Sequence, residues 1–223
     1  TMSETGNLRP DSLFPLVSHF SYWTTKYLYL TPATPNHITA VSLIFGMASA
    51  WMFLDSGYVS GLTGAALLLV CYILDNSDGE IARMKKLSSD FGQRFDTFVD
   101  WVVHAALFLA LGYATTERTG QDIWLWCGLL AAVGGTINYT LDTLRDSGSK
   151  LFEGQERMVE DGPSESKRDQ TAYTSRVIRT DFCFIVLGLA LFNLTWLLVP
   201  AAAIGAQAYW LLQFSRGFRR HHV

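Results

Sequence analysis

Charged residues are scarce in this 223-residue chain, and they are clustered in a few segments. Only 17% of the residues are Asp, Glu, Lys or Arg, whereas 49% are hydrophobic. The windows without any charge cover residues 35–54, 56–74, 101–116, 123–141 and 182–215. A soluble helical bundle is the alternative, but it needs helices with a polar outer face, and window 182–215 offers none. The long uncharged windows therefore predict helices that cross a membrane.

Cysteine is rare, and an excess of positive charge is absent. Cys71, Cys127 and Cys183 are odd in number and fall in apolar windows. They predict packing thiols, and they argue against a disulfide framework or a metal knuckle. A net charge of −3 and a pI near 5.9 argue against nucleic acid as a partner. No strand pattern or internal repeat competes with the helical reading, so the predicted fold class is all-α.

The last uncharged window contains Pro200 and is therefore predicted to form two spans with a break near NLTWLLVP (193–200), which gives six predicted transmembrane helices. They cover residues 36–55, 58–83, 91–115, 122–145, 178–197 and 200–216. Together they form one domain over residues 31–216, in which the polar, turn-rich segment 146–175 is expected to be a mobile cytoplasmic loop. Residues 1–30 are predicted to be a tail followed by an amphipathic helix along the membrane interface, because this helix is aromatic and mildly basic. Residues 217–223 form a basic C-terminal tail.

The distribution of basic residues predicts the orientation in the membrane. With six spans, both termini lie on the same side as the loops at 83–90 and 146–178. Of the 17 Lys and Arg residues, Arg118 alone falls in a loop on the opposite side. The positive-inside rule then places both termini on the cytoplasmic side. We expect a multi-pass protein of the bacterial inner membrane.

Two neighbouring predicted spans carry acidic residues at their cytoplasmic ends, where carboxylates are costly. Asp75 and Asp78 share one helical face, and Asp96 and Asp100 share a face of the next helix. The short connection MKKLSSD predicts that the two helices form an antiparallel hairpin. Four carboxylates in one low-dielectric site require protonation or a cation. All-oxygen ligands favour Mg²⁺, Mn²⁺ or Ca²⁺.

Small residues and an arginine accompany these carboxylates. Gly79, Ala82 and Gly92 leave space for a ligand close to the backbone. Arg83 supplies a forked donor that suits phosphate. Small residues also serve helix packing, and Asp residues also serve as helix caps, but all of them stand in register within residues 75–100. We therefore interpret this segment as a metal site that holds a diphosphate.

The segment resembles the signature of the CDP-alcohol phosphotransferases, also called CDP-alcohol phosphatidyltransferases. The matching pattern is Asp75-x2-Asp78-Gly79-x2-Ala82-Arg83-x8-Gly92-x3-Asp96-x3-Asp100. All eight fixed positions of the signature are present. Residues 34–39 (TPNHIT) look like the family's segment at the start of its first span. The resemblance extends over about residues 30 to 216.

The resemblance implies a reaction, a cofactor and roles for individual residues. The family transfers a substituted phosphate group from a CDP-linked donor to an alcohol and releases CMP, with Mg²⁺ or Mn²⁺ as one or two ions. A homodimer in the lipid bilayer is expected. Asp100 is implied as general base and metal ligand. The other implied metal ligands are Asp75, Asp78 and Asp96. The implied nucleotide-binding residues are Asn36, Asp75, Asp78, Gly79, Ala82, Arg83 and Gly92. The implied acceptor-binding residues are Arg145, Arg176 and Arg179.

The acceptor and the direction of transfer stay open at this point. Six compact spans favour CDP-diacylglycerol as the donor, and Arg176 and Arg179 favour a phosphorylated acceptor such as inositol phosphate or glycerol phosphate. Transfer from CDP-choline or CDP-ethanolamine to diacylglycerol is one alternative, and a cation transporter with a four-Asp site is another. Membrane prenyltransferases also use Asp motifs with Mg²⁺, but those motifs lie far apart in longer chains.

Two further residues near the signature have two interpretations each. Glu80 resembles the residue at this position in branches that make inositol-phosphate lipids, and it is equally interpreted as a solvated carboxylate. His104 is predicted to be a hydrogen-bonded interior residue, with a supporting contact to the metal site as the alternative.

Overall fold

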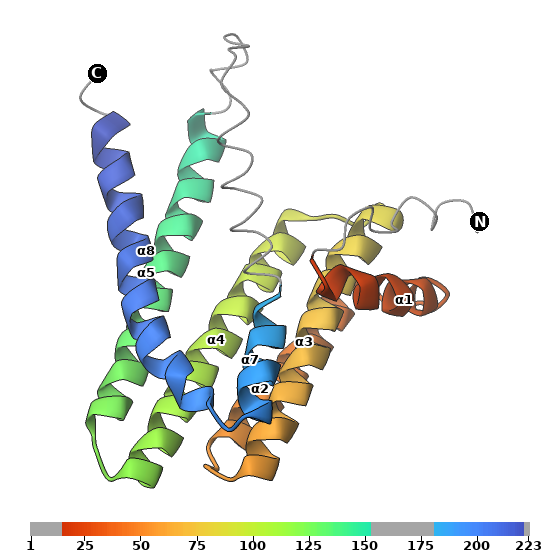
Figure 1. Ribbon diagram of the computed structural model, residues 1–223. Helices are drawn as coiled ribbons and strands as arrows, with labels where there is room; N and C mark the ends of the chain where they lie inside the picture. Colours follow the sequence, from red (N-terminus) through yellow and green to blue (C-terminus); the bar gives the residue numbers. More distant parts are fainter. Residues whose placement is uncertain (1–14, 153–180, 221–223) are drawn as a thin grey trace.

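The computed structural model describes residues 15–152 and 181–220, and its long elements are all α-helices (Figure 1). The elements are α1 (Val17–Tyr29), α2 (Pro35–Phe53), α3 (Tyr58–Met84), α4 (Asp90–Thr119), α5 (Ile123–Phe152), α7 (Phe182–Leu191), the 3₁₀ helix η2 (Thr195–Leu197) and α8 (Leu198–Arg220). The all-α prediction is confirmed for the described part of the chain.

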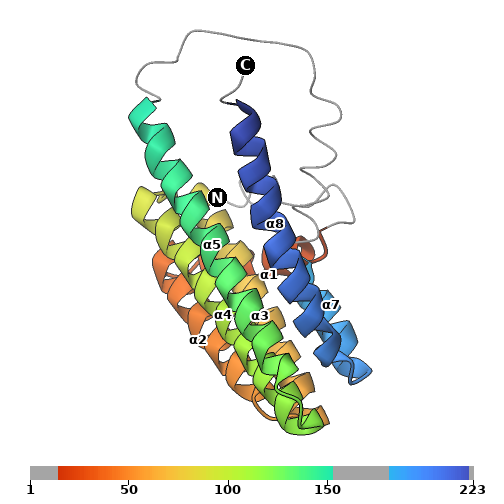
Figure 2. The same cartoon turned by 90° about the vertical axis from the view of Figure 1, so that its left-hand side faces the viewer.

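The helices α2 to α5, α7 and α8 form an elongated bundle, and α1 lies across it beside α3 (Figure 1). Helix α2 packs against α3 and α4, and α4 packs against α5. Helices α5 and α8 run side by side and extend beyond the α3–α4 connection (Figure 2). The α3–α4 connection and the C-terminal end of α8 lie toward one end of the bundle. The α2–α3 and α4–α5 connections lie at the other end (Figure 1).

Local chemistry explains several helix boundaries. Pro35 occupies the first turn of α2, where its missing N–H is not needed. Ser89 precedes α4, and its Oγ accepts a hydrogen bond from the backbone N–H of Gly92 at 3.0 Å. Helix α4 ends at Gly120, whose φ of 68° is a left-handed conformation that glycine adopts without strain.

The end of α5 differs from the prediction. The predicted span stops at residue 145, but α5 continues to Phe152. Residues 146–152, predicted to begin the mobile loop, are therefore helical. The segment from 141 to 152 contains no proline that would stop the helix, so it can continue past the apolar region. The rest of the predicted loop, 153–175, lies outside the described residues.

The predicted span over 178–197 is also wrong at its C-terminal end. Helix α7 ends at Leu191, and Asn193 adopts a left-handed φ of 57°. The backbone N–H of Leu194 turns back to the carbonyl of Leu189 at 2.8 Å, as expected where a left-handed residue terminates a helix. The break between the two helices thus lies at the start of the segment NLTWLLVP (193–200), near which it was predicted, and this prediction is confirmed. Pro200 itself stands in the first turn of α8, which proline tolerates. Residues 178–180 lie outside the described residues.

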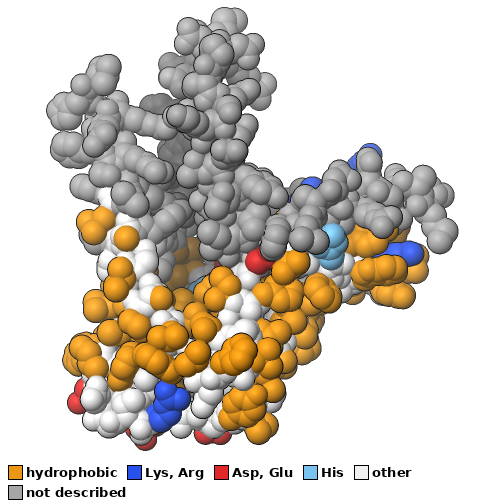
Figure 3. Space-filling model, viewed as in Figure 1, with side chains coloured by type: hydrophobic (Ala, Val, Ile, Leu, Met, Phe, Trp, Pro, Cys, Tyr) orange, Lys and Arg blue, Asp and Glu red, His pale blue; other side chains and the backbone are white. Residues whose placement is uncertain are grey.

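Small and polar residues fill much of the interior, whereas many large apolar residues face outward. Ser42 and Ser49 are fully buried. A Cβ on Gly112 would lie 3.1 Å from the Cα of Gly128, so α4 and α5 approach closely here. Large apolar side chains that are more than half exposed include Ile44, Trp51, Val59, Trp126 and Ile204. Apolar side chains cover much of the bundle surface in Figure 3. In the described ranges, two helices, α3 and α4, are long and apolar enough to cross a membrane.

The three cysteines are free thiols. Cys71 and Cys183 belong to the hydrophobic core, and Cys127 packs partly buried against it. The prediction of packing thiols is confirmed.

Candidate metal and nucleotide site

The site forms where α3 ends and α4 begins. Lys86 adopts a left-handed φ of 54°, and the N–H of Leu87 bonds back to the carbonyl of Ala82 at 2.9 Å, which closes the end of α3. The Nζ of Lys85 donates to the carbonyls of Thr31 and Ala33 at 2.7 and 3.0 Å. Lys85 thereby holds the α1–α2 linker against the α3–α4 hairpin, and the start of α2 comes to lie beside it.

Three of the four predicted carboxylates meet in this hairpin. Asp75, Asp78 and Asp96 each offer an oxygen within 4.8 Å of the other two. Asp78 is 5% exposed, and its Oδ2 accepts a hydrogen bond from the hydroxyl of Thr39 in α2. The Oδ1 of Asp96 is buried and has no hydrogen-bond partner among the described residues. Like charges this close, one with an unsatisfied buried oxygen, call for a cation, and three carboxylates suit a hard divalent ion.

A cleft of about 440 Å³ opens beside the carboxylates. Its lining includes the predicted residues Asn36, Asp78, Gly79, Ala82, Arg83, Gly92 and Asp96. Thr39, Ser88, Ser89 and Gln93 also line it and were not predicted as site residues. Asp75, which the resemblance also implies in nucleotide binding, belongs to the carboxylate cluster but not to the cleft lining.

The structure gives a different reason for glycine at each of the two signature positions, 79 and 92. A Cβ on Gly92 would lie 3.1 Å from both Asn36 Oδ1 and Ser89 Oγ, so this glycine lets the start of α2 approach α4. A Cβ on Gly79 would have one neighbour within 4 Å, Arg83 Nη1 at 3.6 Å. Packing alone does not demand glycine at position 79. Its effect is to leave open space in the cleft.

Asp100 lies one turn beyond Asp96 on α4 and is exposed. It is not part of the group of three within 4.8 Å. Its position, next to the cluster and open to solvent, suits a group that meets an incoming substrate.

A pair of hydrogen bonds through His104 joins α3 and α4 behind the carboxylates. His104 Nδ1 lies 2.7 Å from the carbonyl oxygen of Asp100, and its Nε2 lies 2.8 Å from the hydroxyl of Tyr72. A carbonyl only accepts, so Nδ1 carries the proton, and the Tyr72 hydroxyl donates to Nε2. The ring of Phe182 lies 5.9 Å from the His104 ring. His104 is thus a hydrogen-bonded interior residue, as predicted, and Tyr72 is its unpredicted partner.

Glu80 turns toward α1 and not into the cleft. Its Oε1 accepts a hydrogen bond from Ser21 Oγ at 2.7 Å, and its Oε2 is buried. The interpretation of Glu80 as a solvated carboxylate is wrong, because this carboxylate docks α1 on α3. Its resemblance to the branches that make inositol-phosphate lipids stays a prediction. Asp181 adds a second attachment, since its carboxylate accepts from the backbone N–H groups of Leu16 and Val17 at 3.0 and 3.1 Å.

The predicted acceptor-binding arginines are not placed by the structure. Arg145 belongs to α5, but only its backbone is described. Arg176 and Arg179 lie outside the described residues.

A family model described as CDP-alcohol phosphatidyltransferase matches residues 32–147, slightly more than half of the chain. The chain belongs to the CDP-alcohol phosphatidyltransferase family. The match contains the three-carboxylate cluster and the whole cleft lining. Family members are transferases of substituted phosphate groups, and they are metal-dependent membrane proteins. The cluster of Asp75, Asp78 and Asp96, with its unsatisfied oxygen, fits such a metal.

Relatives agree with this membership. A bifunctional IPC transferase and DIPP synthase of Thermococcus kodakarensis is 32% identical over 119 residues, which are 53% of this chain and 26% of that protein. A protein with the same description from Aquifex aeolicus is 32% identical over 116 residues, 52% of this chain and 25% of that one. The chain thus spans about a quarter of the length of these relatives. An uncharacterized protein of Aquifex aeolicus is 28% identical over 165 residues, 70% of this chain and 77% of its own.

Proposed function

We propose that this protein is an integral membrane enzyme that transfers a substituted phosphate group from a CDP-linked donor to an alcohol and releases CMP. The observation that carries the proposal is the meeting of three carboxylates with a cleft lined by small residues and an arginine. A diphosphate in this cleft would meet the open space at Gly79 and the exposed guanidinium of Arg83.

The carboxylates hold the cofactor. Asp75, Asp78 and Asp96 bind one or two divalent ions, Mg²⁺ or Mn²⁺, and Asp100 completes the ligand set. When bound there, such an ion would neutralise charge on the diphosphate and make CMP a better leaving group. Thr39 orients Asp78 through its hydrogen bond. Its position resembles that of groups that fix metal-binding carboxylates in other proteins.

Asp100 acts as the general base. It is exposed one turn from the cluster, so an alcohol can reach it while the donor lies in the cleft. Its carboxylate accepts the hydroxyl proton as the oxygen attacks the phosphorus of the donor. Holding both reactants at one place supplies much of the remaining rate enhancement.

The donor is CDP-diacylglycerol, and the acceptor carries a phosphate, as inositol phosphate or glycerol phosphate does. Arg145, Arg176 and Arg179 bind that phosphate, because guanidinium groups pair with phosphate oxygens in forked geometry. The names of two relatives, which describe a transferase and a synthase, support a transfer reaction. CDP-choline or CDP-ethanolamine with diacylglycerol is the alternative pair.

The protein crosses the bacterial inner membrane six times, with its termini and active site in the cytoplasm. The outward-facing apolar side chains, together with small residues such as Ser42 and Ser49 buried between the helices, support burial in lipid. Helix α1 lies along the cytoplasmic interface, because Phe20, Trp23 and Tyr27 are each more than half exposed on its outer face. The enzyme is a homodimer, which cross-linking in native membranes would detect.

The test is CMP release by the purified full-length protein with Mg²⁺ or Mn²⁺. CDP-diacylglycerol is combined with a panel of acceptors, and CDP-choline and CDP-ethanolamine are combined with diacylglycerol. We expect release that needs both substrates and disappears in Asp78→Asn. No release with any pair would overturn the proposal, and metal flux into proteoliposomes in its place would favour a cation transporter.

A further inference from the structure

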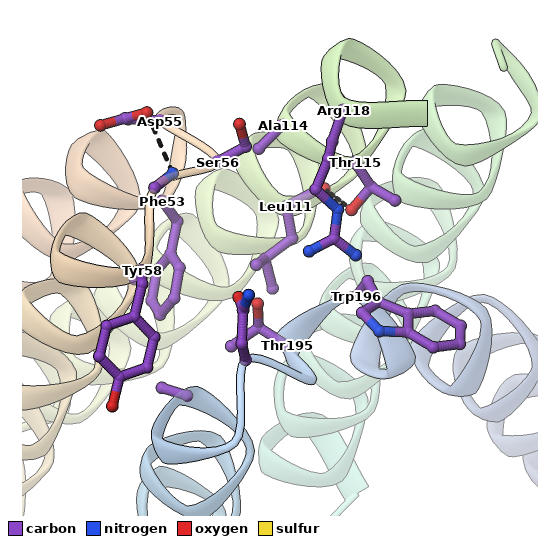
Figure 4. Close-up of a pocket in the computed structure, with 14 residues that line it drawn as sticks. Phe53, Asp55, Ser56, Tyr58, Leu111, Ala114, Thr115, Arg118, Thr195 and Trp196 are labelled. Atoms are coloured by element: carbon purple, nitrogen blue, oxygen red, sulfur yellow. Dashed lines mark hydrogen bonds between the residues drawn. The ribbon is translucent and has the colours of Figure 1, made fainter. Parts of the chain in front are cut away.

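A second pocket lies at the opposite end of the bundle from the carboxylate cleft. It forms where the α2–α3 connection, the end of α4 and the α7–α8 connection meet (Figure 4). Phe53 and Leu111 form an apolar part of its wall, and Arg118, Thr195 and Trp196 form a polar rim (Figure 4). None of these residues belongs to the proposed catalytic site.

Arg118 turns its guanidinium group into this pocket (Figure 4). It makes no hydrogen bond or ion pair with another residue of the described ranges. It is also the one basic residue among the described residues of this end. An arginine that faces inward from a rim without a protein partner is available to an anion from outside.

The nearby carboxylate is engaged elsewhere. Asp55 also lines the pocket, but its Oδ1 accepts from the N–H of Gly57 at 3.1 Å and its Oδ2 accepts from Ser60 Oγ at 2.6 Å. Figure 4 shows its carboxylate directed away from Arg118. Its negative charge is therefore held by the α2–α3 connection and does not neutralise the guanidinium group.

Two neutral polar side chains supplement the arginine. Asn193, in the turn between α7 and η2, and Thr195, the first residue of η2, both line the pocket. Neither side chain makes a hydrogen bond within the described ranges. The pocket thus offers one positive charge from Arg118, an amide from Asn193 and a hydroxyl from Thr195. This set matches a group with one negative charge and several acceptor oxygens, such as a phosphodiester.

The surroundings identify the source of that phosphodiester. Trp51, Leu191 and Phe192 are 70%, 52% and 78% exposed and stand on the elements that border the pocket. We propose that Arg118, Asn193 and Thr195 bind the headgroup phosphate of an anionic phospholipid, whose acyl chains lie on this exposed apolar surface. The site is independent of catalysis and would anchor the bundle at this end through one lipid.

The experiment compares two arginine variants of the purified full-length protein. Arg118→Gln removes the charge of the pocket, and Arg94→Gln removes an equal charge from the exposed surface of the same helix near its other end. Binding of phosphatidylglycerol is titrated by native mass spectrometry from detergent micelles. Any binding in the carboxylate cleft is common to both variants, so a difference between them reports the pocket.

We expect Arg118→Gln to weaken binding of one phosphatidylglycerol molecule roughly tenfold, as loss of a charge-assisted hydrogen bond implies, and Arg94→Gln to leave it unchanged. Inorganic phosphate in excess should not displace that lipid, and neutral diacylglycerol should not replace it. Equal effects of the two variants would overturn the proposal, as would displacement by inorganic phosphate or equally tight binding of diacylglycerol. Both variants should retain wild-type CMP release.

Discussion

In the absence of metal, Asp78→Asn should be more stable than the wild type. In the presence of metal, it should be less stable than the wild type. The substitution keeps an oxygen that can accept the hydrogen bond from Thr39. It removes the charge from a cluster in which three carboxylate oxygens lie within 4.8 Å of one another. The change therefore isolates the charge of one metal ligand.

The magnitude follows from the geometry. At 4.8 Å and an effective dielectric constant of 20, two unit charges repel each other by about 3.5 kcal/mol. The variant removes two of the three repulsive pairs. Proton uptake, relaxation and water considerably reduce the repulsion that the wild type actually feels. We therefore expect Asp78→Asn, without metal, to gain about 1–2 kcal/mol in its free energy of unfolding, or roughly 2–8 °C in Tm. A metal ion at 100 times its Kd stabilises the wild type by about 2.7 kcal/mol, and the variant gains far less.

Thermal unfolding in detergent, followed by tryptophan fluorescence, measures both effects. Each protein is heated with EDTA and with excess Mn²⁺. Asp55→Asn is the matched control, since Asp55 is an exposed carboxylate at the opposite end, bonded to Gly57 and Ser60. This control should respond to Mn²⁺ as the wild type does. A lower Tm of Asp78→Asn in EDTA, or equal stabilisation of both proteins by Mn²⁺, would refute the reasoning.

Three further substitutions test other parts of the site. Asp100→Asn should abolish CMP release but leave binding of the CDP-linked donor largely intact in equilibrium titration, and loss of donor binding would assign Asp100 mainly to the metal. Gly92→Ala should raise the donor KM several-fold, because the new methyl group displaces the asparagine side chain at the start of α2; an unchanged KM would show that this contact is not needed. Tyr72→Phe should lower the free energy of unfolding by about 1–3 kcal/mol, because it leaves the Nε2 of His104 without its donor. The control Tyr58→Phe loses an exposed hydrogen bond of 3.3 Å to the carbonyl of Leu191 and should cost less than about 1 kcal/mol in the same melting assay. Equal losses of stability in the two variants would show that the Tyr72–His104 hydrogen bond does not stabilise the protein.

Spacing along the helices predicted most of the carboxylate site. Asp75 and Asp78 share a face because of their three-residue separation, and the short connection to Asp96 leaves no arrangement but a hairpin. The same helical spacing also predicted that Gly79 lies beside the carboxylates in the cleft. These features depend on separations of a few residues, which a helix converts directly into positions in space.

Contacts between distant segments were not predictable in this way. Tyr72 and His104 are both ordinary residues of apolar helices, and nothing in their spacing indicates that their side chains meet. Glu80 stands beside the signature, but its partner Ser21 lies 59 residues away in α1. The break after α7 was predicted in the right segment, but the end of the helix was placed too late, at residue 197 and not at Leu191. Pro200 is a strong signal for a helix boundary, whereas the left-handed Asn193 carries a weaker one.

The attachment of α1 has a consequence for the order in which the protein assembles. The N-terminal end of α1 is capped by Asp181, which follows Leu16 by 165 positions in the chain. Ribosomal synthesis therefore completes α1 through α5 before the residue that fixes the start of α1 exists. Until then, the contacts that hold α1 to the bundle include the hydrogen bond that Ser21 donates to Glu80. The start of the helix beside the active site is thus secured only after α5 has been synthesised.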